Sequence, residues 1–216
     1  MTTTSPVPGS ITEPGVAAAP ALFAGGASLS RADVAAETGW ARVTVTARLE
    51  RLLDDGLLQA YDAQVNGRGR PATHYRLATD AGSLLVADIG ASGLRVARCD
   101  LAGHPGPSHH LASAIGDGPD TVLETVREGW AALDGAGAPP VWGVAVSLPG
   151  PVEFSTGRVV DPPIMTGWND YAVRDELTTW FGTVAHVEND ANAIAVGEVA
   201  AVTEAGGALS DVLVVK

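Results

Sequence analysis

The sequence predicts an α/β chain made of two parts of different kinds. Residues 28–78 carry two helical patterns followed by two strand-like runs, whereas from residue 82 apolar strands alternate with helices. Charge divides the chain at the same place. The whole chain has a net charge of −12, but residues 28–78 hold seven arginines against six acidic residues. A surface that binds a polyanion is therefore expected within residues 28–78.

The N-terminal segment differs from both parts. Thr, Ser, Pro, Gly and Ala dominate residues 1–20 without periodicity, so we expect a disordered leader there. It lacks the basic start and apolar core of a secretory signal, and no run in the chain approaches the roughly 18 apolar residues of a membrane span. The single cysteine, Cys99, excludes an internal disulfide and suits a reducing cytoplasm. We expect a cytoplasmic protein that does not bind membranes.

A capped helix is expected to begin at Ser30. Asp33 stands three positions on, where an acidic residue stabilises the first turn, and Gly39 can end the helix in the left-handed conformation. A short turn containing glycine between two helices is the signature of a helix-turn-helix. A preceding short helix is expected near residues 16–24.

The second helix of this pair is expected over residues 42–54. Its apolar stripe consists of Val45, Leu49, Leu52 and Leu53. Ala41 stands where a capping Ser or Thr is usual. The opposite face is predicted to contact DNA, because arginine can read guanine or clamp phosphate and short side chains let a helix approach a groove. The predicted contacts on this helix are Arg42, Thr44, Thr46, Arg48 and Arg51.

Two alternating runs, 57–63 and 72–77, are expected to pair as a hairpin. Arg68 and Arg70 lie near glycines at its tip and are predicted to enter the narrow minor groove of A·T-rich DNA. The structural alternative is a solvated hairpin tip. Because the hairpin follows two helices at this spacing, residues 21–80 are predicted to form a winged helix-turn-helix DNA-binding domain.

The second part, residues 82–216, is expected to form a sheet with helices. Strands are expected at 84–90, 94–100, 141–148 and 184–187, and helices at 121–133, 170–181 and 190–200. A last strand is expected to begin at residue 211. The first strand ends in Asp88-Ile-Gly-Ala-Ser92, so an acidic, glycine-containing turn joins it to the second.

The order of motifs in residues 28–216 resembles the ROK family, which contains repressors and sugar kinases. Four runs carry the resemblance: DIGAS, SLPGPVE, PPIMTGW and ENDANAIAVGE. The resemblance implies a partial actin-like, ribonuclease H-like fold of the ATPase and sugar kinase type. On this view residues 82–216 form an incomplete N-terminal lobe.

The resemblance also implies a sugar site. In ROK kinases the aspartate of the NDAN run takes a proton from the sugar hydroxyl, and the matching residue here is Asp190, with Asn189 as a neighbouring sugar contact. The implied sugar-binding set is Gly150, Pro151, Trp168, Asn189 and Asp190. A carboxylate within hydrogen-bond reach of a hydroxyl can serve as such a base. The same Asn-Asp pair is also a good helix cap, and one turn can fill both roles.

Departures from the family pattern argue against a working kinase. The kinase phosphate turn reads Asp-x-Gly-Gly-Thr, whereas Ala91 takes a glycine position here, and Ile164 replaces a sugar-proximal asparagine. The sequence stops at Lys216, before the family's second phosphate turn, zinc cysteines and adenosine lobe. The vestigial phosphate turn comprises Asp88, Gly90 and Ser92, and Asp190 becomes a vestigial catalytic residue. No histidine spacing suggests a metal site, and no cofactor is expected.

The sequence therefore predicts a sugar-responsive transcriptional regulator, most simply a repressor of carbohydrate genes, and not an enzyme. By resemblance, its partners are operator DNA, a sugar or sugar-phosphate effector, and a second copy in a homodimer. Two alternatives stay open: a ROK-type kinase that phosphorylates hexoses with ATP, and a non-functional truncated remnant.

Overall fold

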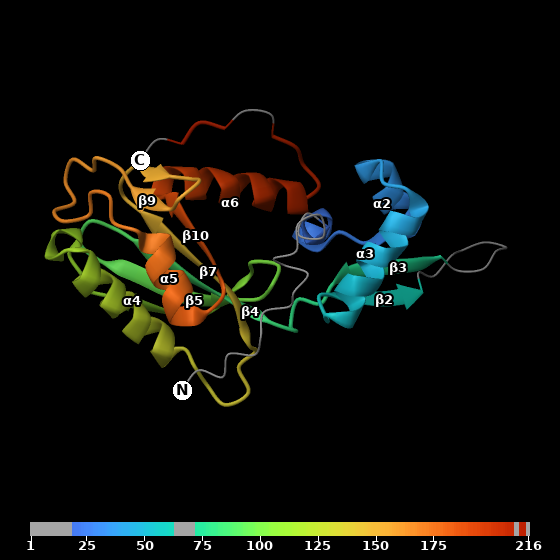
Figure 1. Ribbon diagram of the computed structural model, residues 1–216, viewed down its shortest axis with the longest axis horizontal. Helices are drawn as coiled ribbons and strands as arrows, with labels where there is room; N and C mark the ends of the chain where they lie inside the picture. Colours follow the sequence, from blue (N-terminus) through green and yellow to red (C-terminus); the bar gives the residue numbers. More distant parts are fainter. Residues whose placement is uncertain (1–18, 63–71, 210–211, 215–216) are drawn as a thin grey trace. The chain divides into compact units, whose positions relative to one another are not determined.

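The computed structural model describes residues 19–62, 72–209 and 212–214, and the chain divides between residues 81 and 82 into two compact units. Figure 1 shows their elements. The N-terminal unit contains η1 (Pro20–Gly26), β1 (Leu29–Ser30), α2 (Arg31–Thr38), α3 (Arg42–Asp54), β2 (Leu58–Asp62) and β3 (Thr73–Leu77).

The start of α2 carries the predicted cap. Ser30 Oγ accepts from the Asp33 backbone N–H at 3.3 Å, and the Asp33 carboxylate accepts from the Ser30 N–H at 2.8 Å. These hydrogen bonds from Ser30 lower the pKa of Asp33. Gly39 ends the helix with φ of 69°, as expected. The start of α3 lacks a side-chain cap, because its N-cap residue is Ala41.

The apolar stripe of α3 forms the core of this unit, as predicted. Val45, Leu49 and Leu52 are buried, and Leu53 is half-buried. The segment before α2 differs from expectation. It is a 3-10 helix beginning at Pro20, because proline suits the first position of a helix. Ala19 is fully buried, so ordered structure begins before the end of the predicted leader, whose residues 1–18 lie outside the described part.

The expected hairpin is present as β2 and β3, which pair antiparallel from Leu58↔Leu77 to Asp62↔Thr73. A two-residue strand, β1, pairs with the other side of β3 and was too short to give a sequence pattern. The predicted groove residues Arg68 and Arg70 lie in residues 63–71, outside the described residues.

The C-terminal unit is built on a five-stranded sheet in the order β10-β7-β4-β5-β6. Its elements are β4 (Ser83–Ile89), β5 (Leu94–Cys99), β6 (Pro105–Leu111), η2 (Ile115–Asp117), α4 (Pro119–Ala132), β7 (Val141–Leu148), β8 (Val152–Glu153), β9 (Arg158–Val159), α5 (Val173–Phe181), β10 (Val184–Asn189) and α6 (Asp190–Glu204). Strands β4, β7 and β10 are parallel, whereas β5 and β6 run antiparallel to their neighbours. The carboxyl ends of the three parallel strands therefore meet at one edge of the sheet.

One face of this sheet is covered by α4 and α5, which lie near one another in Figure 1. Alternate residues of β4, including Leu85, Ala87 and Ile89, pack against Val126 and Leu177 from the two helices in one apolar core. Burial of alternate positions is the pattern of a sheet covered on one face.

The structure departs from the sequence prediction in several places, and the short elements η2, β8 and β9 were not expected. Strand β6 was missed because its residues are exposed and carry no alternation; it is held by pairing with β5. Helix α5 begins at Val173 rather than 170, because Asp170 has φ of 59° and Ala172 bridges to Arg158. The strand expected from residue 211 is not seen in residues 212–214, which pair with no strand in the described part of the chain.

Candidate functional site

The outward face of α3 presents arginine and short side chains. Arg42, Val43 and Ala47 are exposed, and Val43 has 79% of its surface open despite being apolar. Thr44 is half-buried beside them. These residues occupy the first half of the helix, so its N-terminal part presents an arginine and short side chains on the surface.

Other predicted contacts on α3 are already engaged. The Arg48 guanidinium stacks on Trp40, 3.6 Å from the ring centroid, and Arg51 pairs with Asp55 at 3.4 Å. Thr46 is half-buried on a flank of the apolar stripe. The predicted contact of Arg48 and Thr46 with DNA stays a prediction: Arg48 lies against Trp40 in the turn before α3, and Thr46 is half-buried beside the core. Sequence reasoning missed Trp40, whose place in the turn between two helices was the available signal.

Three of the residues predicted for the sugar site, Gly150, Asn189 and Asp190, lie at the carboxyl edge of the sheet. Asn189 caps α6, since its Oδ1 accepts from the N–H groups of Ala191 at 2.9 Å and Asn192 at 3.3 Å. Its Nδ2 donates to the Gly150 carbonyl at 3.0 Å, which ties the loop after β7 to the start of α6. Asp190, the first residue of α6, is 8% exposed and accepts from the Ala191 N–H.

Gly150 is required by close packing, because a Cβ there would lie 2.6 Å from Met165 Sδ. Pro151 follows it on the surface. Trp168 is placed differently: it is fully buried in the core, and its Nε1–H donates to the Ile115 carbonyl at 2.9 Å. The prediction that Trp168 contacts a sugar is therefore corrected. Its ring has no accessible surface, so its role is in the packing of the core.

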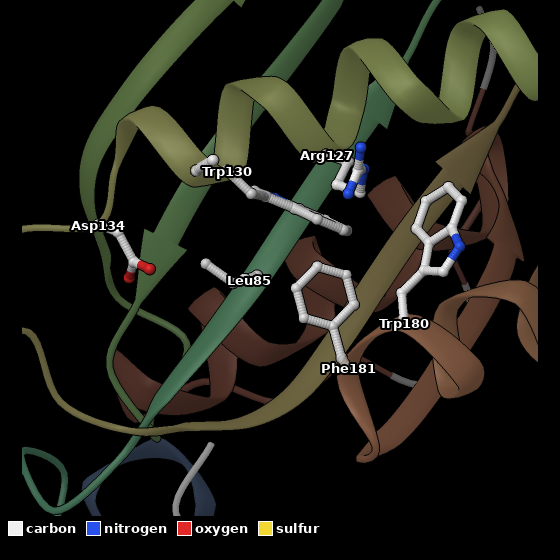
Figure 2. Close-up of a pocket in the computed structure, with 7 residues that line it drawn as sticks. Leu85, Arg127, Trp130, Asp134, Trp180 and Phe181 are labelled. Carbon is white, nitrogen blue, oxygen red and sulfur yellow. The ribbon is translucent and has the colours of Figure 1, made fainter. Parts of the chain in front are cut away.

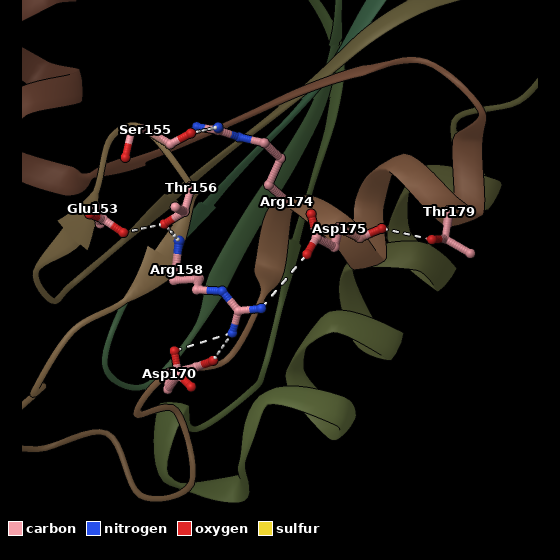
Figure 3. Close-up of polar contacts among 8 residues, drawn as sticks. All are labelled: Glu153, Ser155, Thr156, Arg158, Asp170, Arg174, Asp175 and Thr179. Atoms are coloured by element: carbon pink, nitrogen blue, oxygen red, sulfur yellow. Dashed lines mark hydrogen bonds and ion pairs between the residues drawn. The ribbon is translucent and has the colours of Figure 1, made fainter.

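A polar cluster holds the β8–β9 hairpin that follows Gly150 and Pro151 (Figure 3). Arg174 of α5 donates to the carbonyls of Phe154 at 2.6 Å and Ser155 at 2.7 Å. Arg158 donates to the Asp170 carbonyl at 2.6 Å. A Cβ at Gly157 would meet Arg174 at 2.6 Å, so glycine is needed where the hairpin crosses this side chain. The cluster therefore fixes the loop that carries the predicted sugar contacts.

The predicted phosphate turn joins β4 to β5. It is closed by a bond from the Gly90 N–H to the Gly93 carbonyl at 2.8 Å, and Ser92 is exposed. The Asp88 carboxylate accepts a hydrogen bond from the Ser147 hydroxyl at 2.7 Å. Ser147 is the first residue of the SLPGPVE run, but it was not among the sequence candidates.

An open depression of about 380 Å³ adjoins this turn and is lined by Asp88, Gly90, Gly93, Leu94, Arg95, His110 and Leu111. Arg95 Nε donates to His110 Nε2 at 2.9 Å. Neither residue was a sequence candidate, because they meet only through the pairing of β5 with the unpredicted β6.

Among the described residues, no group of three His, Cys, Asp or Glu side chains could hold a metal ion. No described helix has the length and apolar character needed to cross a membrane.

The ROK family model matches residues 85–216, so the chain belongs to the ROK family. A curated relative, a "Putative xylose repressor" from Caldicellulosiruptor sp. (strain Rt8B.4), is 25% identical over 179 residues, which are 79% of this chain and 43% of the relative. The chain therefore spans less than half the length of that relative.

Among solved structures, a ROK family transcriptional regulator described as a homologue of the E. coli Mlc protein has a TM-score of 0.70 at 24% identity, over 88% of this chain and 48% of the other. At that identity the likeness shows a shared fold. A polyphosphate/ATP-glucomannokinase from Arthrobacter sp. strain KM is 25% identical over 55% of this chain and 48% of its own, with a TM-score of 0.48, too low to support a functional argument.

Proposed function

We propose that this chain is the DNA-binding and effector-sensing part of a sugar-responsive ROK transcriptional regulator that acts on operator DNA in the cytoplasm. The observation that carries the proposal is the arrangement of α2, α3 and the β2–β3 hairpin. Two helices joined through Gly39 precede a hairpin, and the second helix keeps an outward face of arginine and short side chains. This arrangement supports a winged helix-turn-helix, a motif whose second helix enters the major groove.

The N-terminal half of α3 is the part that we propose enters the groove. Arg42 and Ala47 are exposed there, whereas Glu50 and Asp54 are exposed in the second half and would repel phosphates. Recognition helices contact base edges with their N-terminal residues, so this distribution of charge supports the proposal. Family membership and the name of the curated relative support the same function.

A matched pair of substitutions tests the DNA surface. Ala47→Glu places a carboxylate on the outward face of α3, and Ala132→Glu adds the same charge at an exposed position of α4. Binding of the whole chain to a pool of randomised duplexes, measured by fluorescence anisotropy, should weaken at least about tenfold for Ala47→Glu. Ala132→Glu should stay within about twofold. Equal effects of both, or no binding by the unsubstituted chain, would refute the proposal.

The effector site that we propose lies at the Gly150, Asn189 and Asp190 turn. Asp190 follows Asn189, whose side chain donates to the Gly150 carbonyl just before the hairpin that Arg174 holds. A carboxylate and backbone groups at a loop edge are suitable partners for sugar hydroxyls. Calorimetry with hexoses, amino sugars and their phosphates tests this, and Asp190→Asn should abolish any heat that the unsubstituted chain gives.

The kinase alternative makes a different prediction. Phosphoryl transfer needs ATP held in line and its developing charge neutralised, and a base alone does not achieve this. Because Ala91 narrows the backbone approach at the phosphate turn, we expect no ADP release above background in a coupled assay with ATP and a panel of hexoses. Sugar-dependent turnover that Asp190→Asn abolishes would establish the kinase instead.

A further inference from the structure

A crevice of about 350 Å³ lies between α4 and α5, at the opposite end of the sheet from the proposed sugar site (Figure 2). Trp180 and Phe181 end α5 just before β10 begins, whereas Asn189 and Asp190 follow the far end of that strand. A six-residue strand spans roughly 17–20 Å, so the crevice and the sugar turn are separate places.

The interior of the crevice is aromatic. Leu85 of β4 forms its floor, and Trp130 and Phe181 meet edge-to-face with ring centroids 5.3 Å apart. The Trp130 indole N–H already donates to the Val86 carbonyl at 2.9 Å, and the side chain is only 1% exposed, so this ring is a packed apolar back wall of the crevice. Trp180 stands at the mouth and is 36% exposed. Figure 2 shows Trp130 and Phe181 together in the centre of the group, with Trp180 and Asp134 on opposite sides of them.

The charged residues at the rim are of opposite sign, and each has a partner. Arg127 is hydrogen-bonded to Glu124 and also lies 5.9 Å from the Trp180 ring centroid. Asp134 accepts from the buried Arg98 at 2.5 Å. A cationic ligand would be attracted to the Trp180 ring but repelled by Arg127, which already lies beside that ring. An anionic ligand would be repelled by Asp134. The rim therefore favours a ligand without charge.

We propose that this crevice binds a small, planar, uncharged aromatic molecule. Its volume lies near the lower end of the range of about 300–1,000 Å³ typical of ligand pockets, which suits one fused ring system. The exposed Trp180 ring and the half-buried Phe181 ring can stabilise a flat aromatic guest by offset or edge-to-face contacts. The binding does not depend on DNA or sugar recognition, so it is measured without either.

Indole is the probe for the test, added to the whole chain and followed by saturation-transfer NMR and calorimetry. For so few atoms we expect a dissociation constant on the order of 1 mM. Indole-3-carboxylate, tryptamine and cyclohexanol serve as anionic, cationic and non-planar controls, and each should bind more weakly than indole. Charged probes that bind as tightly as indole would overturn the assigned ligand class.

Two substitutions locate the binding. Trp180→Ala removes an exposed aromatic wall, and Ala131→Leu fills the crevice while keeping every ring. Each should weaken indole binding at least about tenfold. Thr178→Ala, at an exposed position of the same helix, should leave it unchanged. Thermal unfolding checks that every variant folds. No saturable binding of indole, or binding that both crevice variants retain, would overturn the proposal.

Discussion

At the scale of single residues, the role of an aromatic side chain depends on where the fold places it. Trp168 and Trp180 are both tryptophans in the C-terminal unit, yet the first is fully buried and the second is 36% exposed. The Trp168 indole N–H donates a hydrogen bond to the Ile115 carbonyl. Its contribution is therefore to stability, through packing and one buried hydrogen bond.

Trp168→Phe should lower the free energy of unfolding by about 2 kcal/mol, because it leaves the Ile115 carbonyl without its donor and opens a small cavity. Trp180→Phe is the matched control and should cost less than about 1 kcal/mol. Urea unfolding followed by near-UV circular dichroism measures both. Equal effects would show that Trp168 does not have the buried role assigned to it.

The Ser30–Asp33 cap predicts a dependence on pH. Hydrogen bonds from Ser30 lower the pKa of Asp33 in the folded chain, so the cap stabilises fully above the unfolded value of about 3.9. This stabilisation is lost as the pH falls through the lower folded value. Asp33→Asn should therefore reduce Tm more at pH 7 than at pH 3. Glu37→Gln, in the same helix, should show a smaller difference between the two pH values; a flat response of Asp33→Asn would contradict the assignment.

At the scale of elements, glycines in two helices have opposite roles. Gly129 in α4 faces the sheet, and a Cβ there would lie 2.5 Å from Leu111 and 2.8 Å from Val96. Gly197 in α6 has nothing within 4 Å of the same added atom. The first glycine permits close approach of helix and sheet, whereas the second only weakens its helix.

Gly129→Ala should therefore destabilise the C-terminal unit by about 1–3 kcal/mol through overpacking. Gly197→Ala should stabilise α6 by about 0.5–1 kcal/mol, because alanine favours the helix. Thermal unfolding of both variants gives the comparison. A loss of stability in Gly197→Ala would show that α6 packs against something at this position.

At the scale of the whole molecule, charge separates the two units. A net charge of −12 opposes approach to DNA except at residues 28–78, where most arginines lie. DNA affinity of the whole chain should fall steeply with salt. Each neutralised phosphate should contribute about −0.9 to the slope of log affinity against log salt concentration. Arg42→Ala should reduce the slope by roughly one such increment. Anisotropy titrations from low to high potassium chloride test this, and an unchanged slope would remove Arg42 from the phosphate contacts.

Local rules were enough to predict much of this protein from its sequence. The Ser30 cap, the Gly39 stop and the 3.6-residue spacing of Val45, Leu49 and Leu52 depend on near neighbours in the chain, and the structure has each of them. The strands β4 and β7 were predicted from their long apolar runs, and β5 from its alternating character. The motifs also indicated the family.

Tertiary structure decided everything that depends on distant segments. Trp168 is buried in a core drawn from several elements, with its N–H on a carbonyl of η2, and the approach of α4 to α5 forms the aromatic crevice. Strand β6 is exposed and shows no alternation of apolar and polar residues, so no sequence pattern indicated its pairing with β5. Periodicity records which face of a segment is apolar, but it does not record which partner covers that face. The sequence alone therefore predicted the caps, the periodic helices and the family. Tertiary packing decided which aromatic rings are buried and which are exposed.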